Sequence, residues 1–368
     1  MAHNILYTPD NVVFSAAIPD IAVEVDGEYV DVDLVAYGAG EVLLAERYFA
    51  FDGMVTVIDL ASLIEDYMLK NKLAYHQFTF RAFTDSDDNM LDWCHLNVIF
   101  CNRIPLGSTA SNFASENFLS SLSIRRIPML SDVGLSFFAQ PGDGVGFTVN
   151  ARYRRADTGE VDVFSYTENE SALAEKPGVC NINFHTREII AEIGNNLEIE
   201  DSLIELSAFT VSAGNRSMSF FIDNSLAGAD RFFFRNCFNV VDCFIPSSVT
   251  TEKSTVERAT AFINGRMCYY NQINSKEYQV ETAALTSDEA YWIDQLFYSR
   301  EIFLKVKSPD SNDWLKLDVI ITDFTCEMAD GDELNKAQFT WRLADNRPAI
   351  ILSSRQRIFT YPYNTVFS

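Results

Sequence analysis

An eight-residue pattern occurs twice in the chain, 126 residues apart. Residues 82–89 read AFTDSDDN and residues 208–215 read AFTVSAGN, so both follow A-F-T-x-S-x-x-N. A longer similarity precedes the pattern, because GMVTVIDLASLIEDYM (53–68) and GVCNINFHTREIIAEI (178–193) both start at a glycine and continue into alternating residues. An internal repeat constrains the expected number of domains more directly than any other sequence feature. The chain is therefore expected to contain two copies of one unit.

Each copy is expected to contain a short helix between strands. In the first copy the apolar residues fall at i, i+3, i+4, i+7 and i+8, which is one face of a helix. These residues are Leu60, Leu63, Ile64, Tyr67 and Met68. Asp59 and, in the second copy, Asn183 are residue types that cap helix N-termini. The expected order of the unit is strand, helix, strand, turn, strand.

The segments around these helices have the alternation of half-buried strands. QFTFRAF (77–83) alternates apolar and polar residues, and LDWCHLNVIF (91–100) returns after a polar turn, so residues 75–100 are expected to form a hairpin. The chain also contains 29 phenylalanines and 15 tyrosines, which favour pleated, half-buried surfaces. Short strands separated by turns every 8–12 residues or so indicate β-sandwiches.

The predicted fold class is mainly β: two related β-sandwich domains and a third, β-rich (α+β) domain with one amphipathic helix. The sandwiches are assigned to residues 1–105 and 118–225, separated by the small, polar and aperiodic segment 103–117. The third domain is assigned to residues 226–368, because its pattern does not match the repeat.

The amphipathic helix of the third domain is predicted at residues 287–298. Thr286 and Glu289 match a capping box, in which two side chains bind the free N–H groups of the first turn. Its apolar side is assigned to Tyr291, Ile293, Leu296 and Phe297.

The charge balance limits the classes of partner. The chain carries 28 basic and 52 acidic residues, a net charge of −24, and this potential repels the phosphates of nucleic acids and of anionic membranes. No run approaches the roughly 20 apolar residues that span a bilayer, so no membrane insertion is expected. Residues 1–20 lack a basic segment followed by an apolar one, and cytoplasmic synthesis without a signal peptide is expected.

Cysteines supply the first candidate site. RFFFRNCFNVVDCFIPSS (231–248) contains Cys237 and Cys243, but the gap between them is not a zinc spacing and no histidine lies near. Asparagine suits turns that need an unusual φ, so the segment is interpreted as two strands bent at NCFN. The seven cysteines are odd in number and include no C-x-x-C pair, which predicts reduced thiols.

Two loops have spacings found in ligand sites. Asp85, Asp87 and Asn89 alternate as at the start of a calcium loop, but the residues that should complete an EF-hand are missing. The repeat partner TVSAGN has no carboxylates, so a turn explains both copies. PGDGVGF (141–147) contains G-x-G-x-G without a helix after it, and it is interpreted as a hairpin turn.

No catalytic, cofactor-binding or metal-binding residue is predicted. The four histidines (3, 76, 95 and 185) form no known catalytic motif, and His76 and His95 are expected to be sheet residues whose nitrogens find local partners. The four tryptophans (93, 292, 314 and 341) are expected mostly in the core or between domains, with a sugar-stacking platform left open. A pair of carboxylates of glycosidase type also stays open, because 52 acidic residues allow some to face each other.

Residues 234–242, FRNCFNVVD, resemble the pattern aromatic-x-Asn-x-Phe-Gly-Val-x-Glu. Asn239 stands at the glycine position and Asp242 at the glutamate position. The pattern is associated with tail and other virion structural proteins encoded by phages and prophages of gut anaerobes. FTWRLADNRP (339–348) and GMVTVIDLASLIEDY (53–67) look similar to the same group, so the resemblance touches all three predicted domains.

The resemblance implies a non-enzymatic building block that binds copies of itself and neighbouring virion or tail proteins, with ring symmetry as the natural arrangement. It supplies no catalytic residue and no cofactor. The virion or tail is then the expected location. Two alternatives stay open: a carbohydrate-binding or adhesin-like β-sandwich module, and a glycoside hydrolase with an unrecognised carboxylate pair.

Overall fold

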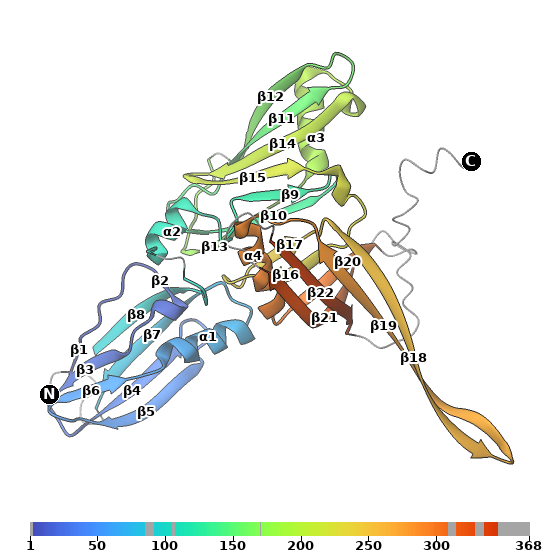
Figure 1. Ribbon diagram of the computed structural model, residues 1–368. Coiled ribbons are helices and arrows are strands. Elements are labelled where there is room, and N and C mark those ends of the chain that lie inside the picture. Colours follow the sequence, from blue (N-terminus) through green and yellow to red (C-terminus); the bar gives the residue numbers. More distant parts are fainter. Residues whose placement is uncertain are drawn as a thin grey trace.

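The computed structural model describes residues 3–84, 92–104, 107–169, 171–307, 314–327 and 335–344. The fold is mainly β, as the sequence predicts. Within these ranges the strands form five sheets, and four α-helices and three short 3₁₀ turns accompany them. Figure 1 shows the units following one another along the chain.

The first unit is a sandwich of two sheets with one helix. Its five-stranded sheet has the order β2-β8-β7-β4-β5, and its three-stranded sheet has the order β1-β3-β6. The elements are β1 (His3–Ile5), β2 (Val13–Phe14), β3 (Ile21–Val25), β4 (Tyr29–Ala36), β5 (Val42–Phe49), β6 (Met54–Val57), α1 (Leu60–Lys70), β7 (Tyr75–Phe83) and β8 (Asp92–Ile99). Apolar residues from both sheets and from α1 form one core.

The second unit has a five-stranded sheet in the order β12-β11-β14-β15-β9 and a two-stranded sheet, β10-β13. Its elements are β9 (Ile124–Ile127), β10 (Asp132–Ala139), β11 (Phe147–Arg155), β12 (Val161–Glu168), β13 (Gly178–His185), α3 (Thr186–Leu197), β14 (Ile204–Ala213) and β15 (Arg216–Ile222). Both sheets and α3 contribute to a separate core.

The two units share one topology. The two five-stranded sheets correspond strand by strand when the order of the second is reversed, so that β2-β8-β7-β4-β5 matches β9-β15-β14-β11-β12. In each sheet a short strand at one edge, β2 or β9, is parallel to its neighbour. The pairs β3-β6 and β10-β13 also correspond, and each leads into the helix. The buried helix positions match at the same offset of 126: Leu60 with Thr186, Ile64 with Ile190, Tyr67 with Ile193, and Met68 with Gly194.

The repeat is not equivalent residue by residue. Phe209 lies in the core of the second unit, whereas Phe83 is only half-buried and is paired with Asp31 on the outer face. The pairing of β11 with β14 shifts after Arg152, and this irregularity changes which residues point inward. The rest of the first copy of the pattern, residues 85–89, lies outside the described residues.

Both predicted N-caps need correction. Asp59 occupies the N-cap of α1 but makes no side-chain cap hydrogen bond, and its φ is 61°. The N-cap of α3 is His185 rather than Asn183. The Nδ1 of His185 accepts from the backbone N–H of Arg187 at 3.0 Å, and the Glu188 carboxylate accepts from the N–H of His185 at 2.9 Å.

The third unit is a seven-stranded sheet in the order β17-β16-β20-β21-β22-β19-β18. Its elements are β16 (Phe232–Arg235), β17 (Val241–Phe244), β18 (Ser248–Ile263), β19 (Arg266–Thr282), α4 (Ser287–Tyr298), β20 (Ile302–Lys307), β21 (Trp314–Glu327) and β22 (Lys336–Leu343). The helix α4 matches the predicted range and has the predicted capping box. Its buried face contains Trp292, whereas Tyr291 is exposed, so that part of the prediction is wrong.

Two segments differ from expectation. The expected linker contains a helix, α2 (Ala110–Glu116), in which Phe113 is buried and the hydroxyl of Thr109 accepts from the N–H of Asn112. PGDGVGF is not a hairpin turn, because β10 before it pairs with β13 and β11 after it belongs to the other sheet. The predicted limits at residues 105, 118 and 226 stay predictions. No helix of the described residues is long and apolar enough to cross a membrane.

Candidate functional site

The segment NCFN forms the turn between β16 and β17, as predicted. The Asn236 carboxamide oxygen accepts from the N–H of Phe238 at 2.9 Å, and the Asn239 N–H donates to the Asn236 carbonyl at 2.9 Å. Asn239 has a φ of 58°, in the left-handed region that glycine adopts without strain. The interpretation of residues 231–248 as strand and turn is confirmed.

This turn is the point where the three units meet. The Asn239 amide donates to the carbonyl oxygens of Met68 and Leu73, at the end of α1, at 3.1 and 2.9 Å. The Asn236 amide donates to the carbonyl oxygen of Leu119 at 2.8 Å. The ring of Phe238 stacks on Phe113 of α2, with centroids 4.9 Å apart. The aromatic stretch therefore joins the three units.

Asp242 is the centre of a buried polar cluster at this junction. Its carboxylate forms an ion pair with Arg125, whose Nη2 lies 2.9 Å from Oδ2, and it accepts from the indole N–H of Trp292 at 3.0 Å. The side chains of Arg125 and Asp242 are 9% and 3% exposed. A buried charge destabilises the folded state unless it is paired. The stability of β9, which carries Arg125, therefore depends on its contact with β17 and α4, which carry Asp242 and Trp292.

A second ion cluster lies beside the turn. Glu301 accepts from Lys72 at 2.9 Å, from Arg235 at 2.8 Å and from Lys316 at 2.6 Å. Burial opposes ionisation of Glu301, but the hydrogen bonds from these three cations outweigh it and lower its pKa to about 2. Lys72 belongs to the first unit and Arg235 to the third, so Glu301 also stabilises the junction.

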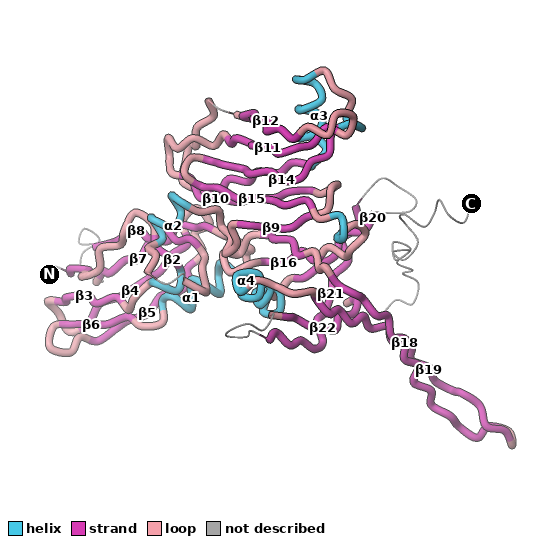
Figure 2. Tube along the Cα trace, turned by 45° about the horizontal axis from the view of Figure 1, so that its top comes forward, coloured by secondary structure: helices cyan, strands magenta, loops and turns pink. Residues whose placement is uncertain are grey.

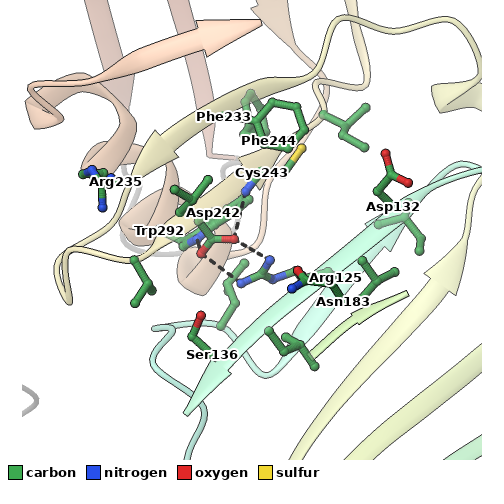
Figure 3. A pocket seen from close by; sticks show the side chains of 18 of the residues that line it. Arg125, Asp132, Ser136, Asn183, Phe233, Arg235, Asp242, Cys243, Phe244 and Trp292 are labelled. Atoms are coloured by element: carbon green, nitrogen blue, oxygen red, sulfur yellow. Dashed lines mark hydrogen bonds and ion pairs between the residues drawn. The ribbon is translucent and has the colours of Figure 1, made fainter. Parts of the chain in front are cut away.

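A cleft of about 1000 Å³ opens between the second and third units. One wall is the outer face of β10 and β13, with Ser136 and Asn183; the other is the outer face of β16, β17 and β20, with Phe233. Figure 3 shows Ser136, Asn183 and Asp132 on one side and Phe233, Cys243 and Phe244 on the other, with Arg125 and Asp242 between them. The cleft therefore presents amides and a hydroxyl opposite aromatic rings.

The carboxylates that line the cleft mostly have structural partners. Asp242 binds Arg125, Glu289 binds Arg126 at 3.1 Å and caps α4, and Glu188 caps α3. These three carboxylates are therefore engaged in bonds that stabilise the fold.

Cys237 and Cys243 lie near the junction, and Cys243 also lines the cleft. Cys237 is buried and Cys243 is half-buried. A hydrogen bond with Cys101, followed by burial, raises the pKa of the Cys237 thiol well above its ordinary value, and burial raises that of Cys243 to about 12. Among the described residues, no group of three or more His, Cys, Asp or Glu side chains could hold a metal ion. The alternating residues Asp85, Asp87 and Asn89 lie outside the described residues.

The histidines and tryptophans are dispersed. His3 lies in β1 and His185 caps α3, while His95 lies 3.1 Å from the Thr79 hydroxyl. The buried Nε2 of His76 has no hydrogen-bond partner among the described residues, so the expectation of local partners is wrong for this atom.

Trp292 and Trp341 are buried, whereas Trp93 of the first unit and Trp314 of the third are more than half exposed. Of these two exposed rings, Trp314 lines the cleft.

The most exposed feature of the molecule is the hairpin of β18 and β19, which we call the arm. Figures 1 and 2 show it projecting far beyond the sheet. Of the described strands, β22 pairs with β19 only at residues 278–281, so the hairpin consists of two strands alone over residues 253–277. All side chains from Thr251 to Tyr269 are exposed except those of Ala259 and Ala261, which are half-buried.

The tip of the arm is apolar on one face. Thr260 is paired with Tyr269 and Phe262 with Met267, and paired residues point to the same face. Phe262, Met267 and Tyr269 are 71%, 66% and 64% exposed. Sequence reasoning missed the arm, although Asn264-Gly265 between two alternating segments is a strong hairpin signal, and both residues have positive φ.

Comparison with known proteins assigns the chain to no family. No family model and no curated protein matches the chain. The crystal structure of CBD12 from CALX1.2 matches over 57% of this chain and 78% of that chain, with 9% sequence identity and a TM-score of 0.18. A TM-score this low supports no statement about fold or function.

Proposed function

We propose that this protein is a non-enzymatic building block that works through protein–protein contacts, and that its setting is the tail or virion of a phage or prophage. The observation that carries the proposal is the arm. An isolated two-stranded hairpin is marginally stable in water, because it buries little apolar surface. An arm with exposed edges and an apolar tip is therefore suited to being covered by another protein.

The organisation of the rest of the chain supports this reading. The three units are joined by buried bonds at one turn, so the arm extends from a connected body. The resemblance also has a physical basis at one position: Asn239 adopts a left-handed φ of 58°, which accounts for glycine at that place in the pattern.

The test is co-purification with virions. An epitope-tagged copy, expressed from its own locus in a host carrying the phage, should sediment with particles or tails. A variant with Phe262→Ser and Met267→Ser should stay in the free fraction while folding normally. Absence of the unaltered protein from every particle fraction would contradict the proposal.

A second candidate function is carbohydrate binding in the cleft. Ring faces opposite amide and hydroxyl groups are the combination that a sugar requires, and Trp314 lines this cleft with a ring that is 55% exposed. Selective binding on a glycan array, lost in Trp314→Ala and kept in Trp93→Ala, would support this function. The hydrolase alternative is less favoured, because three of the lining carboxylates are engaged in structural bonds.

A further inference from the structure

The tip of the arm differs in charge from the rest of the protein. Residues 258–272 contain Arg258 and Arg266 and no acidic residue, so the tip carries +2. The net charge of the chain is −24, and the remainder therefore carries −26. The Arg258 guanidinium lies 5.0 Å from the centre of the Tyr269 ring, so cation and apolar groups share one face. A matching surface should present apolar side chains with carboxylates around them.

Such a surface exists at the far end of the first unit. Phe49, at the end of β5, is 75% exposed, and Phe51, in the next turn, is 80% exposed. Three acidic residues flank them: Asp26 and Glu28 between β3 and β4, and Asp52 between β5 and β6. We call these two loops, with Phe49, the acidic loop pair.

The acidic loop pair is held in a defined shape. The Ala50 N–H donates to the Glu28 carbonyl and the Val25 N–H donates to the Gly53 carbonyl, both at 2.9 Å. Asp52 and Gly53 have φ of 49° and 76°, as a tight hairpin turn with two left-handed residues requires. Arg47, the basic residue of β5, is bound by Asp31 at 2.8 Å. Because the backbone bonds keep the loops in place, the two exposed rings need no rearrangement to receive a partner.

We propose that the arm tip of one copy docks on the acidic loop pair of a second copy. Figures 1 and 2 place the arm and the loops after β3 and β5 at opposite ends of the molecule, so the tip does not reach its own loops. The contact joins two different surfaces and is head-to-tail, which generates a ring or a filament rather than a symmetric dimer. This inference rests on the proposed assembly function and names its partner surface.

The exposed apolar edge of the second unit is a poorer match for the arm tip. Val161 and Val163 on the edge strand β12 are 52% and 63% exposed. Their paired neighbours on β11 are Arg154, which forms an exposed ion pair with Glu205 at 3.7 Å, and Arg152, which shares the face of Val163 and would repel the arginines of the tip. Charge therefore favours the acidic loop pair, and β12 supplies a matched control.

The test uses three double variants of the full chain, each of which replaces two exposed apolar side chains by serine: Phe262→Ser with Met267→Ser on the tip, Phe49→Ser with Phe51→Ser on the loops, and Val161→Ser with Val163→Ser on β12. The tip and loop variants should each weaken self-association at least about tenfold, and the β12 variant should not. Equal melting temperatures would show that each variant folds.

Mixing the tip and loop variants gives the sharpest result. The tip variant keeps intact loops and the loop variant keeps an intact tip, so a head-to-tail contact predicts one-to-one heterodimers that grow no further. Photocrosslinking from benzoylphenylalanine at position 262 should then reach residues 26–28 or 49–53 of the other copy.

The possible negative results overturn different parts of the proposal. Loss of assembly in the tip variant but not in the loop variant would overturn the acceptor surface and leave the assembly function standing. A mixture that stays monomeric, or crosslinks that map to other segments, would overturn the head-to-tail contact. A wild-type protein that neither self-associates nor crosslinks would overturn this inference, while its presence in virions would still support the proposed function.

Discussion

The side-chain amide of Asn239 donates a hydrogen bond to the carbonyl oxygen of Leu73 at 2.9 Å. The two residues are 166 positions apart in the chain and belong to different units. Leu73 lies three residues after the end of α1, and the same amide donates to the carbonyl oxygen of Met68, in the last turn of the helix, at 3.1 Å. One side chain thus fixes the third unit to the segment that ends α1 in the first.

Substitutions at Asn239 separate backbone from side-chain effects. Asn239→Gly keeps the left-handed turn but removes two hydrogen bonds, and should lower the free energy of unfolding by about 1–2 kcal/mol. Asn239→Ala should cost about 1 kcal/mol more, because alanine is strained at this φ. Chemical denaturation measures both. Asn264→Gly, at the left-handed position of the exposed arm turn, is the control and should change stability by less than about 0.5 kcal/mol. Equal stability of Asn239→Gly and wild type would contradict the bridging role.

Breaking the buried ion pair should be among the most costly single changes. Asp242→Asn leaves the buried Arg125 guanidinium without its counter-charge, and is expected to lower the free energy of unfolding by about 3–5 kcal/mol. Replacing both residues, by Arg125→Met with Asp242→Leu, should cost less than Asp242→Asn alone. In the exposed pair of Arg154 and Glu205, 3.7 Å apart, Glu205→Gln should produce no measurable change. A double variant that is less stable than the single one would refute this account of the cluster.

Acid should weaken the junction through Glu301. Its pKa is about 2 in the folded protein against an ordinary 4.5, so its contribution is fully present above pH 4.5 and is lost as the pH falls toward 2. After screening by solvent around the exposed lysines, the loss amounts to about 1–2 kcal/mol. Stability curves of wild type and Glu301→Gln should converge over this range. A constant difference between them from pH 5 down to about pH 2 would contradict the pKa shift.

Thiol reactivity should distinguish the arm from the interior. Of the seven cysteines only Cys268, near the arm tip, is exposed. Brief alkylation of the native protein at neutral pH should modify Cys268 first, because burial and raised pKa values protect Cys237 and Cys243. Peptide mass spectrometry gives the order. Early modification of Cys237 would show that the junction is open in solution.

Local signals in the sequence predicted local structure well. The capping box at Thr286 and Glu289 predicted α4 with its observed bounds, and the alternation in 75–100 predicted the β7-β8 hairpin. The repeat predicted a shared topology, because helix and strand patterns are encoded within each copy. These features depend on residues within a few positions of one another.

Long-range contacts could not be predicted in the same way. Nothing around Asp242 indicates that its partner is Arg125, 117 residues earlier, and nothing near Asn239 indicates the end of α1. The helix in 103–117 was missed because Phe113 is its main anchor, and that ring packs against distant Phe14 and Phe238. The arm is a different case: its NG turn is a local signal, but the side chains of its strands are nearly all exposed, so no burial pattern indicates these strands.

The most direct test of the account is the mass of the purified protein by light scattering over a concentration series, measured for wild type and for Phe262→Ser with Met267→Ser. Both proteins should melt at the same temperature, because the substituted side chains are exposed. Wild type should form a multimer that grows with concentration, and the variant should stay a monomer. A wild type that stays monomeric throughout, or a variant that assembles equally well, would contradict the claim that the arm builds the assembly.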